Sequence, residues 1–281
     1  MEENETENAA PVRLAFRVGY LGDRYFGSQM QAKERTVEGE FVASCVRLGL
    51  FSDYREAGFL AAGRTDRGVH ARRQVFAFST RLPARAIRFL NLQLPRDCWV
   101  SGFAGVPNEF HPRYDARSRT YRYFFGNGDI DVEAMDRGAA SFVGEHDFSP
   151  FARVKDKNPY RRVLAARVFR ERDLSVLEVT AGSFLWHMVR YMASALLMIG
   201  NGDWDEGAID ECLAGDSKRS IGPAPPGYLV LWDVDCGIPF IPITDIGRSM
   251  EFMCDLRTHH AVMAHICESI VGKGGDDPLH Q

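Results

Sequence analysis

The chain has 281 residues, a formal net charge of −4, 45% hydrophobic and 26% charged residues, a composition typical of soluble globular proteins. This length suits one large domain or two of ordinary size. The most apolar stretch, residues 186–199, contains His187 and Arg190 and is too short to span a bilayer. We expect residues 1–11 to be a disordered acidic lead-in rather than a secretory signal, and the protein to be cytoplasmic with no membrane contact.

The first half of the chain predicts a compact α+β domain over residues 12–115. Its apolar residues alternate in the expected strands and recur at helical spacing after Thr36, a candidate N-cap. The expected elements are a strand at 14–20, a helix after Thr36, a strand at 74–78, a helix at 83–92 and a strand at 98–106.

The second half, residues 116–236, repeats a similar order of elements without a sequence repeat. Residues 237–281 form an extension to which no role is assigned. The expected elements are a strand at 118–125, a helix at 131–142, a hairpin of 162–170 and 174–181, helices at 184–199 and 208–213, and a strand at 228–233.

Six cysteines occur without a CxxC pair, which favours buried thiols in a reducing cytoplasm over a disulfide framework. A cluster of histidines and cysteines near the C-terminus has two readings, a metal site or a solvated helix. On a helix these side chains do not share a face, so we predict no metal site. The cluster consists of Cys254, His259, His260, His265 and Cys267.

Arginine accounts for 29 of the 34 basic residues. Its planar guanidinium suits phosphate recognition, although a GC-rich genome would produce the same bias. The arginines also cluster, which predicts a basic groove for a nucleic acid. The clusters are Arg64, Arg67, Arg72 and Arg73; Arg113, Arg117, Arg119 and Arg122; and Arg153, Lys155, Lys157, Arg161 and Arg162.

A turn rich in charged residues lies between two expected strands. Residues 62–71 hold Arg64, Asp66, Arg67 and His70 between glycines. Such side chains either meet a ligand or only pair with one another. The full string Ala-Gly-Arg-Thr-Asp-Arg-Gly-Val-His-Ala resembles the signature of the TruA family of tRNA pseudouridine synthases. The resemblance implies that Asp66 is the catalytic residue.

Arg190 lies in a helix that is apolar on nearly all sides. A buried guanidinium without a partner would cost several kcal/mol, so Arg190 should meet a carboxylate or a phosphate unless it reaches solvent from the helix edge. The string His187-Met188-Val189-Arg190 resembles a second TruA motif, whose arginine pairs with the catalytic aspartate. We therefore predict an Arg190–Asp66 pair.

Further site residues follow from the resemblance. Tyr121 begins the string Tyr121-Arg122-Tyr123, which is similar to a third family motif, and is implied to stack on the target uracil. The alternating aromatics by themselves would indicate strand core. Arg64 is implied to contact the flipped nucleotide, and Leu229 to line the pocket. RNA contacts are expected from Arg67, His70, His111 and Arg113.

The chain departs from the family pattern at four positions, none of which is Asp66, Arg64, Tyr121 or Arg190. These departures therefore bear on the choice of RNA positions rather than on catalysis. They are Leu21 and Ser28 where aspartate and tryptophan are usual, Pro112 for alanine and Tyr191 for asparagine.

The resemblance covers about residues 12–234. It implies two similar α/β halves with largely antiparallel sheets flanking a basic active-site cleft, the pseudouridine synthase fold. It further implies a homodimer that acts on uridines of the tRNA anticodon stem-loop, at positions 38 to 40. Turning uridine into pseudouridine is redox-neutral and adds no group, so we expect no cofactor and no metal.

Two other functions remain open from the residues alone. One is a non-catalytic RNA-binding protein or RNA chaperone on the same scaffold, which the basic clusters and aromatics support equally. A carboxylate in a phosphate-binding groove argues against it, because it repels phosphate. The other is a small-molecule phosphate enzyme that uses residues 63–68 as an anion loop, but the chain has no GxGxxG or P-loop pattern there.

Overall fold

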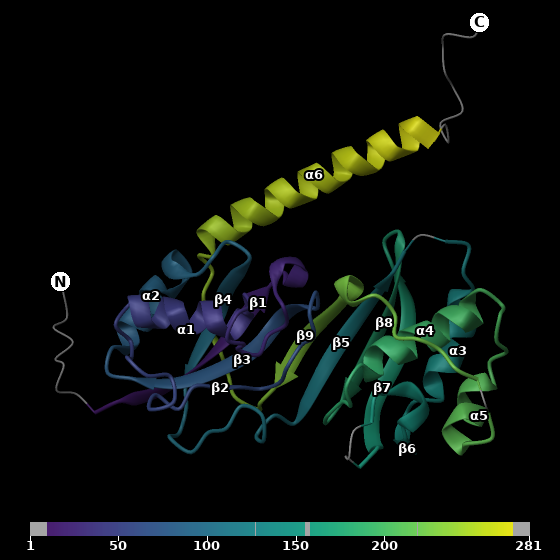
Figure 1. Cartoon of the computed structure of the whole chain (residues 1–281), viewed down its shortest axis with the longest axis horizontal. Helices are drawn as coiled ribbons and strands as arrows, with labels where there is room; N and C mark the ends of the chain where they lie inside the picture. Colours follow the sequence, from purple (N-terminus) through teal and green to yellow (C-terminus); the bar gives the residue numbers. More distant parts are fainter. Residues whose placement is uncertain (1–9, 127, 155–157, 218, 272–281) are drawn as a thin grey trace, which may run out of the picture.

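The computed structural model describes residues 10–126, 128–154, 158–217 and 219–271 (Figure 1). Within this part the strands form one sheet with the order β10-β4-β1-β3-β9-β5-β8-β7-β6, and β2 pairs with β3 outside that order. Every pairing in the sheet is antiparallel except that of β3 with β9. The predicted α+β class with a largely antiparallel sheet is confirmed.

The N-terminal half confirms each expected strand and helix. Thr36 caps its helix as predicted, because its hydroxyl oxygen accepts a hydrogen bond from the Gly39 backbone N–H at 3.2 Å. Phe16, Phe41 and Phe76 are fully buried in a core between the sheet and the helices. The elements are β1 (Val12–Tyr20), α1 (Val37–Arg47), β2 (Leu60–Ala61), β3 (His70–Thr80), α2 (Pro83–Gln93) and β4 (Cys98–Gly105).

The C-terminal half has a separate core, centred on α4 and its neighbours. Figure 1 shows α3 and α4 side by side next to β7 and β8, in agreement with the contacts of α3 with both α4 and β7. The elements are β5 (Ser118–Phe125), α3 (Val132–Ala140), β6 (Gly144–Asp147), β7 (Tyr160–Glu171), β8 (Leu174–Ala181), α4 (Met188–Gly200), α5 (Ala208–Ala214) and β9 (Leu229–Asp235).

Helix α4 begins four residues later than the sequence predicts. The expected helix started at Phe184, but His187 adopts a left-handed backbone conformation with φ of +64°. Just before it, Trp186 pairs with Arg153, whose backbone N–H donates to the Trp186 carbonyl at 3.0 Å. This change of backbone direction holds residues 184–187 outside the helix.

Strand β9 joins the two halves into one sheet. It pairs in parallel with β3 at His70–Val230 and Ala71–Leu231, and antiparallel with β5 over most of its length. Tyr121 on β5 packs against both cores. The chain therefore reaches the centre of the sheet late, after β1 to β8 and before the short edge strand β10 (Ile241–Pro242).

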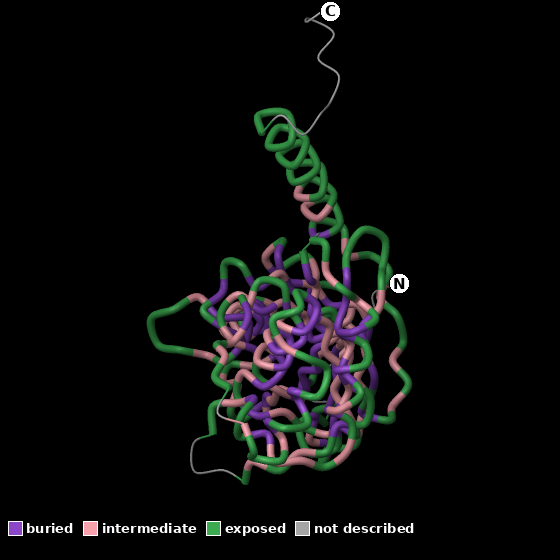
Figure 2. Tube along the Cα trace, turned by 90° about the vertical axis from the view of Figure 1, so that its right-hand side faces the viewer, coloured by how far each residue is buried: buried purple, intermediate pink, exposed green. Residues whose placement is uncertain are grey.

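The segment after β9 crosses to the edge of the sheet as β10 (Ile241–Pro242) and continues as α6 (Gly247–Val271). Figures 1 and 2 show α6 leaving the body of the protein, and its residues beyond Leu256 are exposed. All six cysteines are free; four are buried, whereas Cys254 and Cys267 are exposed on α6. No metal-binding group of three His, Cys, Asp or Glu side chains occurs among the described residues. In the same part of the chain, no helix has the length and apolar character needed to cross a membrane.

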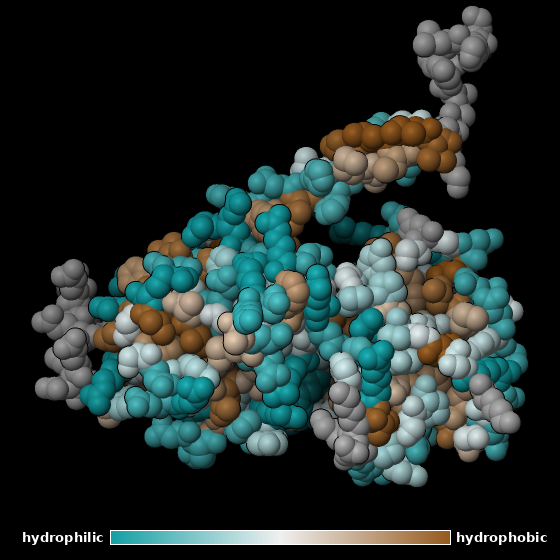
Figure 3. Space-filling view, viewed as in Figure 1, coloured by the Kyte–Doolittle hydropathy of each residue, from teal (hydrophilic) through white to brown (hydrophobic). Residues whose placement is uncertain are grey.

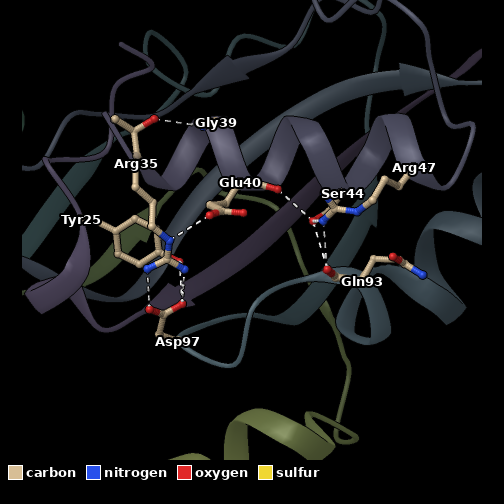
Figure 4. A network of polar contacts seen from close by, with 9 residues as sticks. Tyr25, Arg35, Gly39, Glu40, Ser44, Arg47, Gln93 and Asp97 are labelled. Carbon is tan, nitrogen blue, oxygen red and sulfur yellow. Dashed lines mark hydrogen bonds and ion pairs between the residues drawn. The ribbon is translucent and has the colours of Figure 1, made fainter. Parts of the chain in front are cut away.

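A polar network fixes the loop that leads into α1 (Figure 4). The Arg35 guanidinium donates to both carboxylate oxygens of Asp97 at 2.8 and 2.9 Å and to Glu40 at 2.8 Å, and the Tyr25 hydroxyl donates to Asp97 at 2.7 Å. Burial alone would raise the pKa of the Asp97 carboxyl, but these hydrogen bonds outweigh it and hold the pKa below its ordinary value.

Arg35→Ala will lower the free energy of unfolding by about 2–3 kcal/mol, because it strands the buried Asp97 carboxylate. The depressed pKa of Asp97 means that this stabilisation is present at neutral pH and is lost as the pH falls below about 4. Urea titration at pH 7 and pH 3.5 measures both effects. Arg47→Ala is the matched control: this side chain bonds only Ser44 and the Gln93 carbonyl, and should cost under about 1 kcal/mol. Equal losses for the two variants would contradict the assignment.

Candidate active site

Asp66 lies in the loop that joins β2 to β3, and backbone contacts fix that loop at both ends. The Ala62 N–H donates to the Val75 carbonyl at 2.9 Å, and the Gln74 side-chain amide donates to the Gly63 carbonyl at 3.0 Å. On the other side of Asp66, the Val69 N–H donates to the Asp66 carbonyl at 3.1 Å. The aspartate therefore projects from a rigid turn rather than a free loop.

Thr65 anchors the same loop to the N-terminal segment. Its N–H donates to the Ser28 hydroxyl at 2.9 Å, the Ser28 N–H donates to the Thr65 carbonyl at 3.0 Å, and the Tyr20 and Thr65 hydroxyls lie 2.8 Å apart. Gly27 lets the two segments approach: its φ is +92°, and a Cβ there would lie 3.1 Å from the Thr65 carbonyl oxygen. Ser28, one of the departures from the family pattern, is thus a structural partner of the loop.

The C-terminal half supplies three side chains that face Asp66. The Trp186 indole N–H donates to Asp66 Oδ1 at 3.1 Å. His187 Nε2 lies 3.4 Å and Arg190 Nη1 lies 3.8 Å from Asp66 Oδ2. The structure thus brings the predicted pair together as an ion pair. Asp66 retains 32% of its side-chain exposure, whereas His187 and Arg190 retain 12%, so the carboxylate is more accessible than the two basic side chains beside it.

Electrostatics at the pair reflect this burial. Burial lowers the pKa of the His187 imidazole, and the charges of Arg190 and Arg153 lower it further, while Asp66 opposes them. His187 is therefore neutral at pH 7. Burial likewise lowers the pKa of Arg190, against the opposing charge of Asp66. A guanidinium still keeps its proton, so Arg190 is the lasting positive charge beside the carboxylate.

Arg190 is also tied to the segment that precedes β9. Its Nε donates to the Ala224 carbonyl at 2.6 Å, and the Ala224 N–H donates to the Arg190 carbonyl at 3.0 Å. Because these bonds use the Nε and the backbone of Arg190, the Nη1 end of the guanidinium faces Asp66 in a fixed orientation.

Tyr121 stands at the boundary of the two halves, half-buried beside the site. Its ring packs edge-on against Phe184, with the ring centroids 5.1 Å apart. Burial raises the pKa of Tyr121 to about 12, and the charge of Asp66 adds to the effect. Its phenol is therefore neutral at pH 7 and lies within electrostatic reach of the carboxylate.

The loop arginines predicted to contact RNA lie at the surface. Arg64 is exposed, and its charge acts on Glu38. Arg67 is also exposed and stacks over the Phe26 ring at 4.2 Å. Both flank Asp66 in the chain, and neither forms an ion pair with it among the described contacts.

The remaining predicted residues take different positions. His70 Nδ1 accepts from the Gly22 N–H at 3.0 Å and Nε2 lies 2.9 Å from the Gly227 carbonyl oxygen, so both ring nitrogens join parts of the fold. His111 accepts from the Arg113 N–H at 3.2 Å in a surface loop, where Arg113 is exposed. Leu229 is buried in the C-terminal core.

Several clustered arginines are engaged inside the protein, which corrects the expectation that whole clusters face RNA. Arg119 donates to four carbonyl oxygens, among them that of Ala62 at the start of the Asp66 loop. Arg122 is paired with Glu171 and Glu178 and stacks on Trp232. Clustering in the sequence does not show on which face of a strand an arginine lies. It also does not show which hydrogen-bond acceptors are close to that arginine in the folded protein. Lys155 and Lys157 lie outside the described residues.

Sequence reasoning missed Trp186 and gave no individual role to Arg153. The Trp186 ring is 42% exposed, donates to Asp66, and lies under the Arg153 guanidinium at 5.4 Å. The available signal was position alone: Trp186 immediately precedes the His187-Met188-Val189-Arg190 string. Nothing in the residue type distinguished it from a core aromatic.

This arrangement holds one partly exposed carboxylate between side chains of the N-terminal and C-terminal halves of the chain. The Trp186 indole and the Arg190 guanidinium face its two oxygens. Such a carboxylate is suited to attack an electrophilic carbon or to accept a proton from a substrate that enters between the halves.

Comparison with known proteins finds relatives over most of the chain. The family model for tRNA pseudouridine synthase matches residues 139–235. Among the relatives, tRNA pseudouridine synthase A of Methanosphaerula palustris is 51% identical over 261 residues, covering 93% of this chain and 92% of its own. The protein of the same name from Methanoculleus marisnigri is 52% identical, covering 91% and 94%. That of Thermococcus onnurineus is 41% identical, covering 82% and 87%.

Identity of 51–52% extends over nearly the whole of both chains and not over one motif alone, and this establishes that the proteins are related. The chain therefore belongs to the TruA family of tRNA pseudouridine synthases, which are isomerases.

Proposed function

We propose that Asp66 is the catalytic carboxylate with which this enzyme converts uridine to pseudouridine in tRNA. The observation that carries the proposal is the convergence of Trp186, His187 and Arg190 on a partly exposed carboxylate. A solvated surface aspartate without a function would not require three side chains from the other half of the protein to hold its orientation. A non-catalytic RNA-binding protein would also gain nothing from a negative charge at the centre of its cleft.

The reaction breaks the bond from uracil N1 to ribose C1′ and rejoins the base through C5. In one route an Asp66 oxygen attacks C1′ as N1 leaves with the bonding electrons; C5 of the rotated base then attacks C1′ and expels the carboxylate. In the other route Asp66 removes the ribose C2′ proton as N1 leaves C1′ with the bonding electrons, which forms a glycal; C5 of the rotated base then bonds to C1′ and C2′ takes its proton back from Asp66. In both routes C5 finally loses its proton and N1 gains one, so the product is an isomer of the substrate. Arg190 stabilises the carboxylate whenever it is released as an anion.

The neighbouring residues are proposed to receive the flipped nucleotide. Tyr121, held edge-on by Phe184, stacks on the uracil, and its neutral phenol adds no charge to the pocket. Arg64 and Arg67 contact phosphates beside the target, and Arg113 does so from the loop before β5. His111 is proposed to contact RNA in that same loop, whereas His70 supports the site by holding the Gly227 segment. Leu229 backs the pocket from the core.

The finer description rests on the family resemblance. We propose that the substrate uridines lie in the anticodon stem-loop, at positions 38 to 40, and that the enzyme acts in the cytoplasm as a homodimer. The four free buried thiols suit a reducing compartment. The match to tRNA pseudouridine synthase A over most of the chain supports this choice of substrate.

The test is the pseudouridine map of unmodified tRNA transcripts after incubation with the purified enzyme. Carbodiimide labelling and primer extension locate each modified uridine. We expect product confined to the anticodon stem-loop. Product only in another arm would reject the proposed position and retain the activity, while binding to many tRNAs without product in any of them would reject the catalytic proposal.

A further inference from the structure

Helix α6 presents a regular apolar seam whose distal part, beyond Leu256, is exposed in the described chain. Seven positions recur with alternating steps of three and four residues, the spacing at which two helices pack along each other. Five of them are apolar, including the exposed Met263, Ile266 and Ile270. Figure 3 shows this hydrophobic stripe on the distal half of the helix. The seam is Ser249, Phe252, Leu256, His259, Met263, Ile266 and Ile270.

The body of the protein holds only the first turns of α6. Ser249 is buried, Arg248 donates to the Leu92 carbonyl at 3.0 Å, and Arg96 lies over the Phe252 ring at 5.3 Å. From Arg257 to Val271 each residue is exposed. A helix of 25 residues is about 37 Å long, so more than half of its length extends without tertiary support.

The amino-acid composition of the exposed part of α6, from Arg257 to Val271, indicates that its partner is a protein. Residues 258–267 contain no Asp, Glu, Lys or Arg, although they are exposed. The whole helix has two cations, Arg248 and Arg257, against three carboxylates, which disfavours RNA and an anionic membrane surface. Exposed apolar surface of this kind marks an interaction site.

The remainder of this chain is a poor candidate for covering the seam. Residues 1–9 and 272–281, which lie outside the described part, read Met-Glu-Glu-Asn-Glu-Thr-Glu-Asn-Ala and Gly-Lys-Gly-Gly-Asp-Asp-Pro-Leu-His-Gln. Between them they offer one methionine and one leucine. The match to the Methanosphaerula palustris protein spans 261 residues, whereas 246 residues precede α6, so the matched sequence extends into this helix.

We propose that α6 pairs antiparallel with α6 of a second copy of this chain. This pairing sets Leu256 against the partner copy's Ile266 and His259 against its Met263, so no seam histidine faces another. A parallel pairing would stack His259 on His259. At one flank, antiparallel pairing opposes Asp255 to Ser269 and Val262 to Val262. At the other flank it opposes Met253 to Cys267 and His260 to His260, so no two carboxylates and no two guanidiniums meet.

The inference rests on the homodimer proposed above, but not on its chemistry. Sedimentation of the full-length chain from about 1 to 100 µM tests it without reference to pseudouridine formation. The wild type should be a dimer. Met263→Asp with Ile266→Asp should raise the dissociation constant at least about 100-fold. Ala261→Asp with Ala264→Asp, which adds the same charge off the seam on exposed turns of the same helix, should change it less than about 3-fold.

A disulfide tests the orientation. In a Cys254→Ser, Cys267→Ser background, Val262→Cys should cross-link two full-length chains under mild oxidation, because antiparallel pairing brings the two positions together. A monomeric wild type would overturn both the homodimer and the role of α6. A dimer equally insensitive to both double variants would retain the homodimer and overturn the α6 interface. A seam-dependent dimer that Val262→Cys does not cross-link would overturn the antiparallel geometry.

Discussion

Asp66→Asn will abolish pseudouridine formation while leaving tRNA binding intact. Asparagine preserves the shape of the side chain and an acceptor for the Trp186 indole, but its amide neither attacks C1′ nor takes a proton. We expect the single-turnover rate to fall by at least about 10⁴-fold, as when a nucleophile is removed from other enzymes. Affinity for tRNA, measured by filter binding, should stay equal or tighten slightly because a negative charge leaves a phosphate-binding cleft.

Asp115→Asn is the matched control for that variant. This carboxylate is also exposed and also lies in a loop proposed to face RNA, where it accepts a hydrogen bond from the His111 N–H at 2.9 Å. Its replacement should change the rate by less than about 3-fold. A rate within about 10-fold of wild type for Asp66→Asn would remove Asp66 from the chemistry.

Arg190→Ala will reduce both activity and stability. The guanidinium lies 3.8 Å from Asp66 and bonds the Ala224 carbonyl, so alanine removes the charge beside the carboxylate and strands a backbone acceptor. We expect the single-turnover rate to fall about 10²–10³-fold. The free energy of unfolding should drop by about 1–3 kcal/mol. Pre-steady-state product formation and urea titration measure the two effects separately.

The control for stability is Arg137→Ala, which breaks an exposed ion pair with Glu206 and should leave the free energy of unfolding close to that of the wild type. Full activity in Arg190→Ala would contradict the proposed pair. A large loss of activity with no loss of stability would show that Arg190 acts on substrate alone and does not hold the segment before β9.

The local elements of the fold could be predicted because short-range patterns determine them. Thr36 begins α1 as its hydroxyl predicts, and β1 and β5 form where apolar residues alternate. Burial along β1 does not alternate, however, because both faces of that strand are covered over most of its length. The start of α4 could not be predicted from the sequence. The left-handed conformation of His187 depends on the pairing of Trp186 with Arg153, which is distant in the chain. Periodicity records which residues are apolar, and not where the backbone turns.

The site shows the same division. Asp66 and Arg190 could be predicted because motif resemblance joins residues more than a hundred positions apart, and the structure places them within 4 Å. Trp186 could not, because its contact with Asp66 depends on the backbone turn at His187. The arginine clusters could not show which arginines are available to RNA, for a related reason. Arg119 and Arg122 bind acceptors in segments that are distant in sequence.

The late position of β9 in the chain affects how the protein folds during its synthesis. The strand that bridges the halves leaves the ribosome long after β3, with roughly 7 to 30 seconds of synthesis between them at 5–20 residues per second. Until then β3 and β5 each keep an edge without its partner. A nascent chain that stops before residue 229 thus lacks the strand that joins the loop bearing Asp66 to the half bearing Arg190. The approach of Asp66 to Arg190 therefore has to wait until β9 has been synthesised.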